Sequence, residues 1–322
     1  MATHYRMFSA EFSGVKDAYN RLGRMLNTLG EIESSRNGPV KTLPGPIMVM
    51  FNDPRKRVLF DAARDANPFF HLMEALWMLA GRNDTAFVQQ FNSNITSYSD
   101  DGTSFNAAYG YRWSRHFGYD QLDEAVAMLK ANPDDRRVVV GMWDPNNDLG
   151  SSSKDIPCNT QIMFRIVKGV LNMLTTNRSN DLIWGLCGAN YVHMSIMHEW
   201  VSAAVGVPLG TWHHVSNNLH VYERHWKLIQ GIPAEAAVQY YQYDRYDTID
   251  NADLFRKECH ALVDGQEDDF DDPFLYGTAA PMLAAWRAHK AGDKKEAMYQ
   301  ASCIEAWDWR VACIEWLQRR NK

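Results

Sequence analysis

Hydrophobic residues recur at helical spacing in several parts of the chain. The pattern predicts helices over 9–29 and 69–80, and again over 85–94 and 119–131. Two further helices are expected later in the chain, an amphipathic one over 191–204 and another over 219–230. Helices therefore account for much of the chain.

Shorter apolar runs between these helices predict strands. A buried strand is expected over 47–51, after a Gly/Pro-rich loop at 36–46. β-Branched runs predict three more strands, at 136–143, 160–167 and 170–176, with Lys168-Gly169 forming the turn between the last two. The mixture of helices and strands indicates an α+β fold.

The C-terminal part has a different character. After Asp264 the chain is first acidic, and it then contains two helical stretches rich in Trp and Ala. Since no fixed-period repeat is present, we expect one domain over 1–322. Its core is expected at about 15–230, and a helical C-terminal extension at about 250–322.

Composition excludes several classes of protein. Hydrophobic residues make up 46% and charged residues 22% of the chain, which is ordinary for a globular protein. The longest apolar stretches are shorter than the roughly 18 to 20 residues that cross a bilayer, and the N-terminus has no secretion signal. A net charge of -6 argues against broad nucleic-acid binding, but it allows a local basic pocket for a small phosphate. The expected location is cytoplasmic.

The cysteines point to a thiol site. The chain has five, an odd number without a CxxC pair, so neither a disulfide framework nor a zinc site is indicated. Cys158 lies in Ile-Pro-Cys-Asn, between a Ser/Asp-rich loop and a predicted strand, where a thiol can face a cavity on a rigid backbone. A buried structural cysteine is the alternative.

Arginines flank this cysteine in the sequence. Arg136-Arg137 precedes it and Arg178-Ser179 follows it, so guanidinium groups and a hydroxyl can converge near the thiol. Arginine binds phosphate with two parallel hydrogen bonds, and its charge favours thiolate over thiol. Surface ion pairs are the alternative interpretation of these arginines.

In their order along the chain, these elements resemble the thymidylate synthase superfamily over about residues 15–230. The similar segments are Arg36-Asn-Gly, Glu74-Ala-Leu-Trp-Met-Leu-Ala-Gly81, Tyr109-Gly110, Arg136-Arg137, Trp143, Pro157-Cys158, Arg178-Ser179-Asn180-Asp181, Gly185-Leu186, Asn190 and His220-Val221-Tyr222. A collinear set of this size is far more specific than any one motif. The resemblance implies a mixed sheet packed with helices.

The resemblance also implies the chemistry. Cys158 would add as a thiolate to carbon 6 of a pyrimidine ring, which makes carbon 5 nucleophilic toward an activated one-carbon unit. Glu74 and Tyr109 would organise proton transfer through water, and Asp181 belongs to the same catalytic group. The implied one-carbon donor is 5,10-methylene-tetrahydrofolate.

Substrate-binding residues follow from the same resemblance. The family's pattern gives the nucleotide phosphate to Arg36, Arg178 and Ser179, and the sugar hydroxyl to His220 and Tyr222. It gives the base to Asn190, with Ala189 as a rival because the match needs one extra residue after Gly185. In the family's dimer, Arg136 and Arg137 would reach the phosphate of the second subunit.

Some features depart from the synthase pattern and resemble the hydroxymethylase branch, known from phages. Asn159 follows Cys158 where synthases have His, segment 92–99 lacks the expected tryptophans, and the synthases' closing tail is not recognisable. Polar side chains at Asn94, Thr96, Ser97 and Ser99 can position a water, so hydroxymethyl transfer is expected ahead of methyl transfer. Tyr98, or a C-terminal Trp, is the alternative source of aromatic cover.

Other functions stay open at this stage. A cysteine hydrolase would pair Cys158 with His193 or His220, although such a pair gives no role to the arginines. A non-catalytic nucleotide-binding relative is possible, but it would have no need of Cys158 and Glu74 together. The choice between uracil and cytosine is also open, because the His that normally follows the cysteine is missing.

Overall fold

The computed structural model describes residues 7–233, 248–266 and 269–320. Its larger sheet has the strand order β1-β4-β9-β7-β6-β5. β1 pairs with β4, and β9 with β7, in parallel; the other neighbours are antiparallel. The strands are β1 (Phe8–Phe12), β4 (Ile47–Phe51), β5 (Val139–Gly141), β6 (Asn159–Val167), β7 (Val170–Asn177) and β9 (Leu209–Ser216). The predicted mixed sheet is confirmed.

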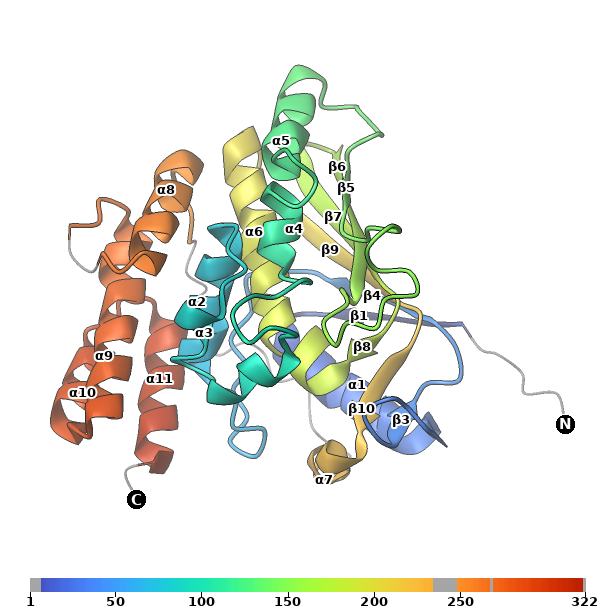
Figure 1. The fold of residues 1–322 in the computed structure, drawn as a ribbon, viewed down its shortest axis with the longest axis horizontal. Helices are drawn as coiled ribbons and strands as arrows, with labels where there is room; N and C mark the ends of the chain where they lie inside the picture. Colours follow the sequence, from blue (N-terminus) through green and yellow to red (C-terminus); the bar gives the residue numbers. More distant parts are fainter. Residues whose placement is uncertain (1–6, 234–247, 267–268, 321–322) are drawn as a thin grey trace, which may run out of the picture.

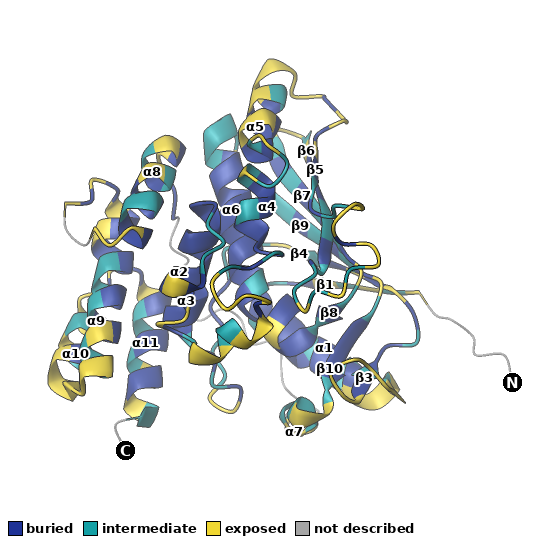
Figure 2. Ribbon diagram, in the orientation of Figure 1, coloured by how far each residue is buried: buried dark blue, intermediate teal, exposed yellow. Residues whose placement is uncertain are grey.

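Helices form layers on one side of this sheet. Figure 1 shows α6 (Ala189–Val205) beside the sheet and α2 (Pro68–Leu79) beyond it. Both helices are buried on every side over most of their length, as Figure 2 shows. The prediction of an amphipathic helix at 191–204 is therefore wrong about its faces, because α2 and the sheet cover α6 from opposite sides.

Further helices complete this part of the fold. α1 (Val15–Leu29) packs near the smaller sheet, and α4 (Tyr109–Ser114) and α5 (Gln121–Ala131) lie beside α2 and α6. The hairpin between β6 and β7 turns through Lys168 and Gly169, at φ 53° and 78°. Two consecutive left-handed residues make the tight turn that matches strand twist, as the sequence predicts.

A second sheet holds part of the site. It has the order β2-β3-β10-β8, from β2 (Glu31–Glu33), β3 (Val40–Thr42), β8 (Asn180–Asp181) and β10 (Leu219–Tyr222). The predicted helix at 219–230 is thus wrong in its first part; only α7 (Trp226–Gln230) is α-helical. Leu219 to Tyr222 is extended because it pairs with two strands that are distant in the sequence.

Two other predicted helices are shorter than expected. The first begins at Val15, because residues 8–12 form β1 alongside β4. The helix expected at 85–94 ends early, as α3 (Thr85–Val88), and a 3₁₀ turn, η1 (Ser93–Tyr98), follows. Asn92 starts that turn by accepting a hydrogen bond from the Asn94 amide, which competes with continuation of the helix.

The C-terminal helices share the core of the molecule. They are α8 (Ala252–Val263), α9 (Ala280–Ala291), α10 (Lys294–Ser302) and α11 (Trp307–Arg320). Within the described residues, three α-helices rather than two helical stretches therefore follow Asp264. Trp286 and Trp316 pack on each other and on Phe69 of α2. These helices cover the side of α2 that faces away from the sheet (Figure 1).

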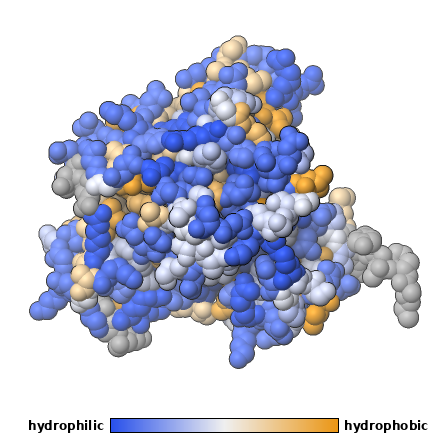
Figure 3. Space-filling model, viewed as in Figure 1, coloured by the Kyte–Doolittle hydropathy of each residue, from blue (hydrophilic) through white to orange (hydrophobic). Residues whose placement is uncertain are grey.

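The outer surface is mostly polar. The face in Figure 3 is largely hydrophilic, with only scattered apolar areas. Among the described residues, no helix combines the length and apolar character needed to cross a bilayer.

Candidate active site

Cys158 lies where two cavities meet. It directly precedes β6, and its carbonyl accepts a hydrogen bond of 2.9 Å from the Arg178 amide. Its half-buried thiol lines a polar cavity of about 640 Å³ and a mainly apolar one of about 210 Å³. The backbone holds the thiol rigidly at the junction, as the sequence predicts.

The polar cavity contains the predicted phosphate and sugar residues. Besides Cys158, six of the predicted site residues line it: Arg36, Arg178, Ser179, Asp181, His220 and Tyr222. They come from the loop before β3, the end of β7, β8 and β10, and the smaller sheet joins three of these segments. Residues separated by almost two hundred positions are thus brought to one wall.

Backbone carbonyls orient the two arginines of this cavity. Arg178 donates from Nε to Pro157 O and from Nη2 to Ile156 O, both at 3.0 Å, and it lies over the Trp143 ring. Arg36 donates to the carbonyls of Ser153 and Lys154. A guanidinium has five N–H donors, so each arginine retains donors for an anion.

His220 and Tyr222 occupy alternate positions of β10, so they share one face of the strand. Their rings meet edge to face with centroids 5.0 Å apart. His220 Nδ1 lies 2.8 Å from Asn218 Oδ1, and burial lowers the His220 pKa, which favours the neutral ring. A neutral imidazole can exchange hydrogen bonds with a hydroxyl.

Glu74 and Tyr109 line the apolar cavity. Glu74 comes from α2 and Tyr109 from the start of α4, and both are buried. Tyr109 Oη accepts a hydrogen bond from the Asn159 amide at 3.4 Å. Burial raises the Tyr109 pKa, and the Cys158 charge raises it further, so the phenol keeps its proton. The predicted proton-transfer residues therefore lie in the same cavity as the thiol.

His193 is a site residue whose position the sequence analysis missed. Its Nε2 lies 2.7 Å from Glu74 Oε2, both side chains are buried, and both line the apolar cavity. Neither His193 nor His220 is hydrogen-bonded to Cys158 in the described part of the chain. This arrangement counts against a hydrolase dyad. Three positions separate His193 from Asn190 on α6, one helical turn, which is the signal that links them.

Asn190 lines the apolar cavity, whereas Ala189, the alternative base-binding residue, does not. The segment before α6 is a π turn, Leu182–Leu186, in which the Cys187 amide donates to Leu182 O. A π turn takes up one more residue than an α-turn, which accounts for the one-residue gap in the motif. Within the described residues the Asn190 amide has no protein partner.

Asp181 shapes the same segment. Its Oδ2 accepts a hydrogen bond from the Trp184 amide at 3.0 Å and so caps the π turn. Its Oδ1 is buried without a partner in the described structure. Asp181 also pairs with His220 in the register of β8 and β10. It therefore links the turn before Asn190 to the polar cavity.

Burial has the largest effect on the pKa of the Cys158 thiol. Burial raises the pKa of Cys158, the Arg178 charge opposes this, and Asp155 and Asp181 raise the pKa further. From the sequence, the arginines are predicted to favour the thiolate. Their charges act in the predicted direction, but loss of solvation outweighs them.

Arg136 and Arg137 line neither cavity of their own chain. Both are exposed, and the Arg137 side chain, 82% exposed, forms an ion pair with Asp135. Their role toward a second subunit stays a prediction.

Segment 92–99 meets the site with different residues from those predicted. Ile95 and Tyr98 line the apolar cavity, whereas the Thr96 and Ser97 hydroxyls donate to carbonyls of their own turn. Ser99 is buried against Asp101 and Ser104. Tyr98, the alternative source of aromatic cover, lines both cavities.

Asn159 is turned away from the thiol. It is fully buried, and its amide donates to Asn177 Oδ1 and to Thr176 O of the neighbouring strand. The residue after the cysteine thus supports the sheet and lines neither cavity.

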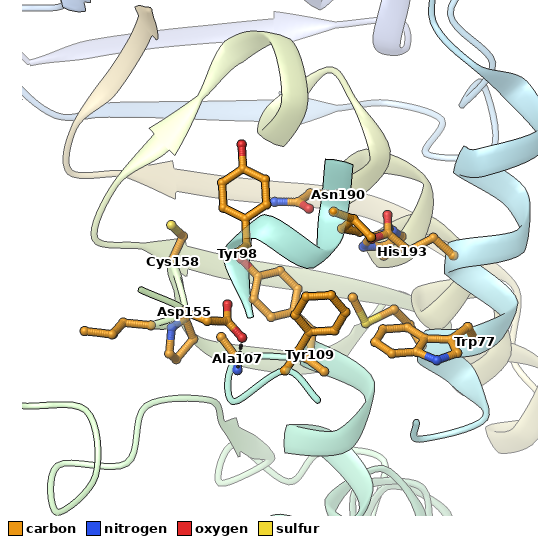
Figure 4. Close-up of a pocket in the computed structure, with 15 residues that line it drawn as sticks. Trp77, Tyr98, Ala107, Tyr109, Asp155, Cys158, Asn190 and His193 are labelled. Carbon is orange, nitrogen blue, oxygen red and sulfur yellow. Dashed lines mark hydrogen bonds and ion pairs between the residues drawn. The ribbon is translucent and has the colours of Figure 1, made fainter. Parts of the chain in front are cut away.

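Asp155 was not predicted. It lines both cavities three positions before Cys158, and Figure 4 shows it on the same side as the thiol, with His193 and Trp77 on the opposite side. Its place at the end of the Ser/Asp-rich loop was the available signal. No cluster of three or more metal-ligating side chains occurs in the described part of the chain.

Comparison with known proteins agrees with this geometry. Residues 49–240 match the thymidylate synthase family model. The chain is 43% identical over 310 residues to deoxyuridylate hydroxymethyltransferase of Pseudomonas phage M6, covering 91% of this chain and 88% of the relative. It is 38% identical to the protein of the same name from Bacillus phage SP01, covering 60% of this chain and 53% of that relative. With its cysteine, arginines and buried glutamate arranged around two joined cavities, this chain belongs to the thymidylate synthase family.

Proposed function

We propose that the chain is a folate-dependent deoxyuridylate hydroxymethyltransferase. It would convert dUMP, 5,10-methylene-tetrahydrofolate and water into 5-hydroxymethyl-dUMP and tetrahydrofolate. The observation that carries the proposal is the place of Cys158, between a cavity with two arginines and a cavity with a buried carboxylate. The names of the phage relatives favour the hydroxymethyl product and uracil as the base.

The polar cavity suits the nucleotide. Arg36, Arg178 and Ser179 would bind the phosphate, and His220 and Tyr222 the sugar hydroxyl. Asn190 lines the neighbouring cavity, and no protein partner for its amide occurs among the described residues. This amide can accept from uracil N3–H while donating to O4. The base would therefore lie beside Cys158, with carbon 6 facing the thiol.

The apolar cavity suits the reacting face of the folate co-substrate. Trp77, Phe105 and Tyr98 supply aromatic surface. His193, which is hydrogen-bonded to Glu74, lies across the cavity from Cys158 (Figure 4). The Cys158 thiolate adds to carbon 6, and carbon 5 then attacks the methylene carbon of the co-substrate. Glu74, held by His193, would manage removal of the carbon 5 proton through water.

Loss of tetrahydrofolate leaves an exocyclic methylene on carbon 5. Water adds to this methylene, the electrons return through carbon 5, and the Cys158 thiolate leaves carbon 6. Thymidylate synthesis is the second candidate, because hydride from the folate can reduce the same methylene. Tyr98 favours that alternative to a degree, since it supplies aromatic cover at the rim of both cavities.

Product analysis separates the two functions. The purified protein is incubated with dUMP and 5,10-methylene-tetrahydrofolate, and with dCMP or CMP in parallel. We expect a dUMP product one oxygen heavier than thymidylate, without the absorbance change of dihydrofolate formation. Stoichiometric dihydrofolate together with thymidylate would refute the hydroxymethyltransferase.

We also propose a homodimer in which Arg136 and Arg137 reach the partner's phosphate site. Both side chains are exposed and outside the cavities of their own chain. Subunits mutated at Arg137 and at Cys158, mixed as heterodimers, should recover partial activity. The enzyme would act on small nucleotides rather than on nucleic acid, since a net charge of -6 does not favour nucleic-acid binding. Its proposed location is the cytoplasm of a phage host.

A further inference from the structure

Asp155 is a carboxylate in the wall that the two cavities share. With Tyr98, Ile156 and Cys158 it lines both of them, and Figure 4 shows its carboxyl on the Cys158 side. Glu74 lines the apolar cavity only, where it is hydrogen-bonded to His193. Asp155 and the Glu74–His193 pair thus belong to different parts of the site.

Hydrogen bonding to the main chain orients this carboxylate. Asp155 Oδ2 accepts from the Ala107 amide at 2.8 Å, and no cation of the described chain lies within ion-pair distance of it. Arg112 acts on it only from a distance, and that guanidinium is fully buried with two hydrogen bonds to Asp148. Asp155 is held in place, but its charge is not neutralised by a partner.

Its protonation is suited to proton transfer near neutral pH. Burial raises the pKa of Asp155 to about 6; the Ala107 amide and Arg112 lower it, and Asp100 raises it. The charge of Asp155 also raises the pKa of Cys158 and of Tyr109. A base is most effective when its pKa lies near the working pH.

We propose that Asp155 binds the water that adds to the exocyclic methylene and takes a proton from it. This inference rests on the proposed hydroxymethyltransferase function. The water oxygen bonds to the methylene carbon as one O–H proton passes to the carboxylate. The methylene double-bond electrons move toward carbon 5 and its carbonyl, and then expel the Cys158 thiolate from carbon 6. Asp155 afterwards releases the proton to solvent, and no oxidant or reductant is needed.

Other polar groups are less suited to this step. The Thr96 and Ser97 hydroxyls are hydrogen-bonded to carbonyls of their own turn, and neither residue lines either cavity. Glu74 is paired with His193 and is required earlier, for the carbon 5 proton. Among the carboxylates that line the apolar cavity, Asp155 is the one next to the thiol (Figure 4).

The test is Asp155→Asn, whose amide oxygen can still accept from Ala107. Assays contain dUMP tritiated at carbon 5, the folate and 2-mercaptoethanol, a competing nucleophile that can add to the same methylene. We expect tritium release to stay within about threefold of the unmodified enzyme, whereas the hydroxymethyl product falls about a hundredfold, the scale of a lost general base. The thioether product should replace it.

The pH profile gives a second readout. In the unmodified enzyme, the ratio of hydroxymethyl to thioether product, corrected for the fraction of 2-mercaptoethanol present as thiolate, should fall as the pH drops below about 6, where Asp155 gains a proton. In Asp155→Asn this ratio should be low and independent of pH, and Asp155→Glu should restore part of it. Asp293→Asn, at an exposed carboxylate before α10 and outside both cavities, is the matched control and should behave as the unmodified enzyme.

Two results would overturn the inference while leaving the proposed function intact. One is an Asp155→Asn enzyme that still makes hydroxymethyl-dUMP at near the unmodified rate. The other is tritium release that falls as far as product formation, which would assign Asp155 an earlier or structural role. Thymidylate as the product of the unmodified enzyme would instead overturn both proposals.

Discussion

The two cavities that meet at Cys158 are built in different ways. The polar one lies among loops and short strands, and main-chain carbonyls orient its two arginines. The apolar one lies between core helices, where the buried Glu74 and His193 side chains are hydrogen-bonded to each other. The arginines proposed to bind the nucleotide are thus close to solvent. The groups proposed to transfer protons are buried, where charges are less well solvated. Cys158 and Asp155 belong to both cavities and connect binding with reaction.

The largest expected effect is that of Cys158→Ser, which removes the thiol that both cavities share. Turnover should fall by at least about a thousandfold, because the nucleophile of the covalent step is lost. Binding of dUMP should change little, since the polar cavity keeps its arginines. Calorimetry and product analysis measure the two effects, and Cys303→Ser, at an exposed cysteine far from the site, is the control. Turnover above about a hundredth of the unmodified rate would contradict the role of Cys158.

Arg178→Ala should affect the polar cavity alone. We expect dUMP binding to weaken by about 1.5 to 3 kcal/mol, the scale of hydrogen bonds to a charged group, with deoxyuridine binding little changed. Calorimetry with both ligands gives the comparison, and Arg310→Ala in α11 serves as the control. Equal losses for nucleotide and nucleoside would show that Arg178 acts by holding the Ile156 and Pro157 carbonyls rather than the phosphate.

The raised pKa of Asp155 predicts how the free energy of unfolding depends on pH. Its folded pKa of about 6 lies above its ordinary value of 3.8, so the folded state retains the proton that the unfolded state loses. The free energy of unfolding should therefore decrease as the pH rises from about 4 through about 6. Because the side chain is partly exposed, we expect Asp155→Asn to gain about 1 to 2 kcal/mol over the unmodified protein across this window. Urea unfolding at pH 4 and pH 7.5 measures it; an equal difference at both values would disprove the shift.

The smallest expected effect concerns the base. Asn190→Asp should shift kcat/KM toward dCMP by about tenfold, since the cytosine amino group donates where uracil O4 accepts. Competition between dUMP and dCMP measures this ratio, and Asn94→Asp, at an exposed amide of η1, is the control. An unmodified enzyme that already prefers dCMP would show that Asn190 does not select uracil as proposed.

The sequence by itself determined the locally encoded features. The Lys168-Gly169 turn fixes the hairpin of β6 and β7, and the apolar spacing around Glu74 fixes a buried helix. The order of the motifs around Cys158 indicated the family, because each motif has a fixed chemical requirement. These features need only neighbouring residues.

Only the tertiary structure decided the rest. Residues 219–222 belong to a predicted helix, but pairing with β3 and β8 makes them a strand. Asp155 and His193 resemble many polar residues of the chain until the fold places one beside the thiol and the other against Glu74. Strand pairing and burial depend on segments far apart in the sequence, and the free energy of these long-range contacts overrides local preference.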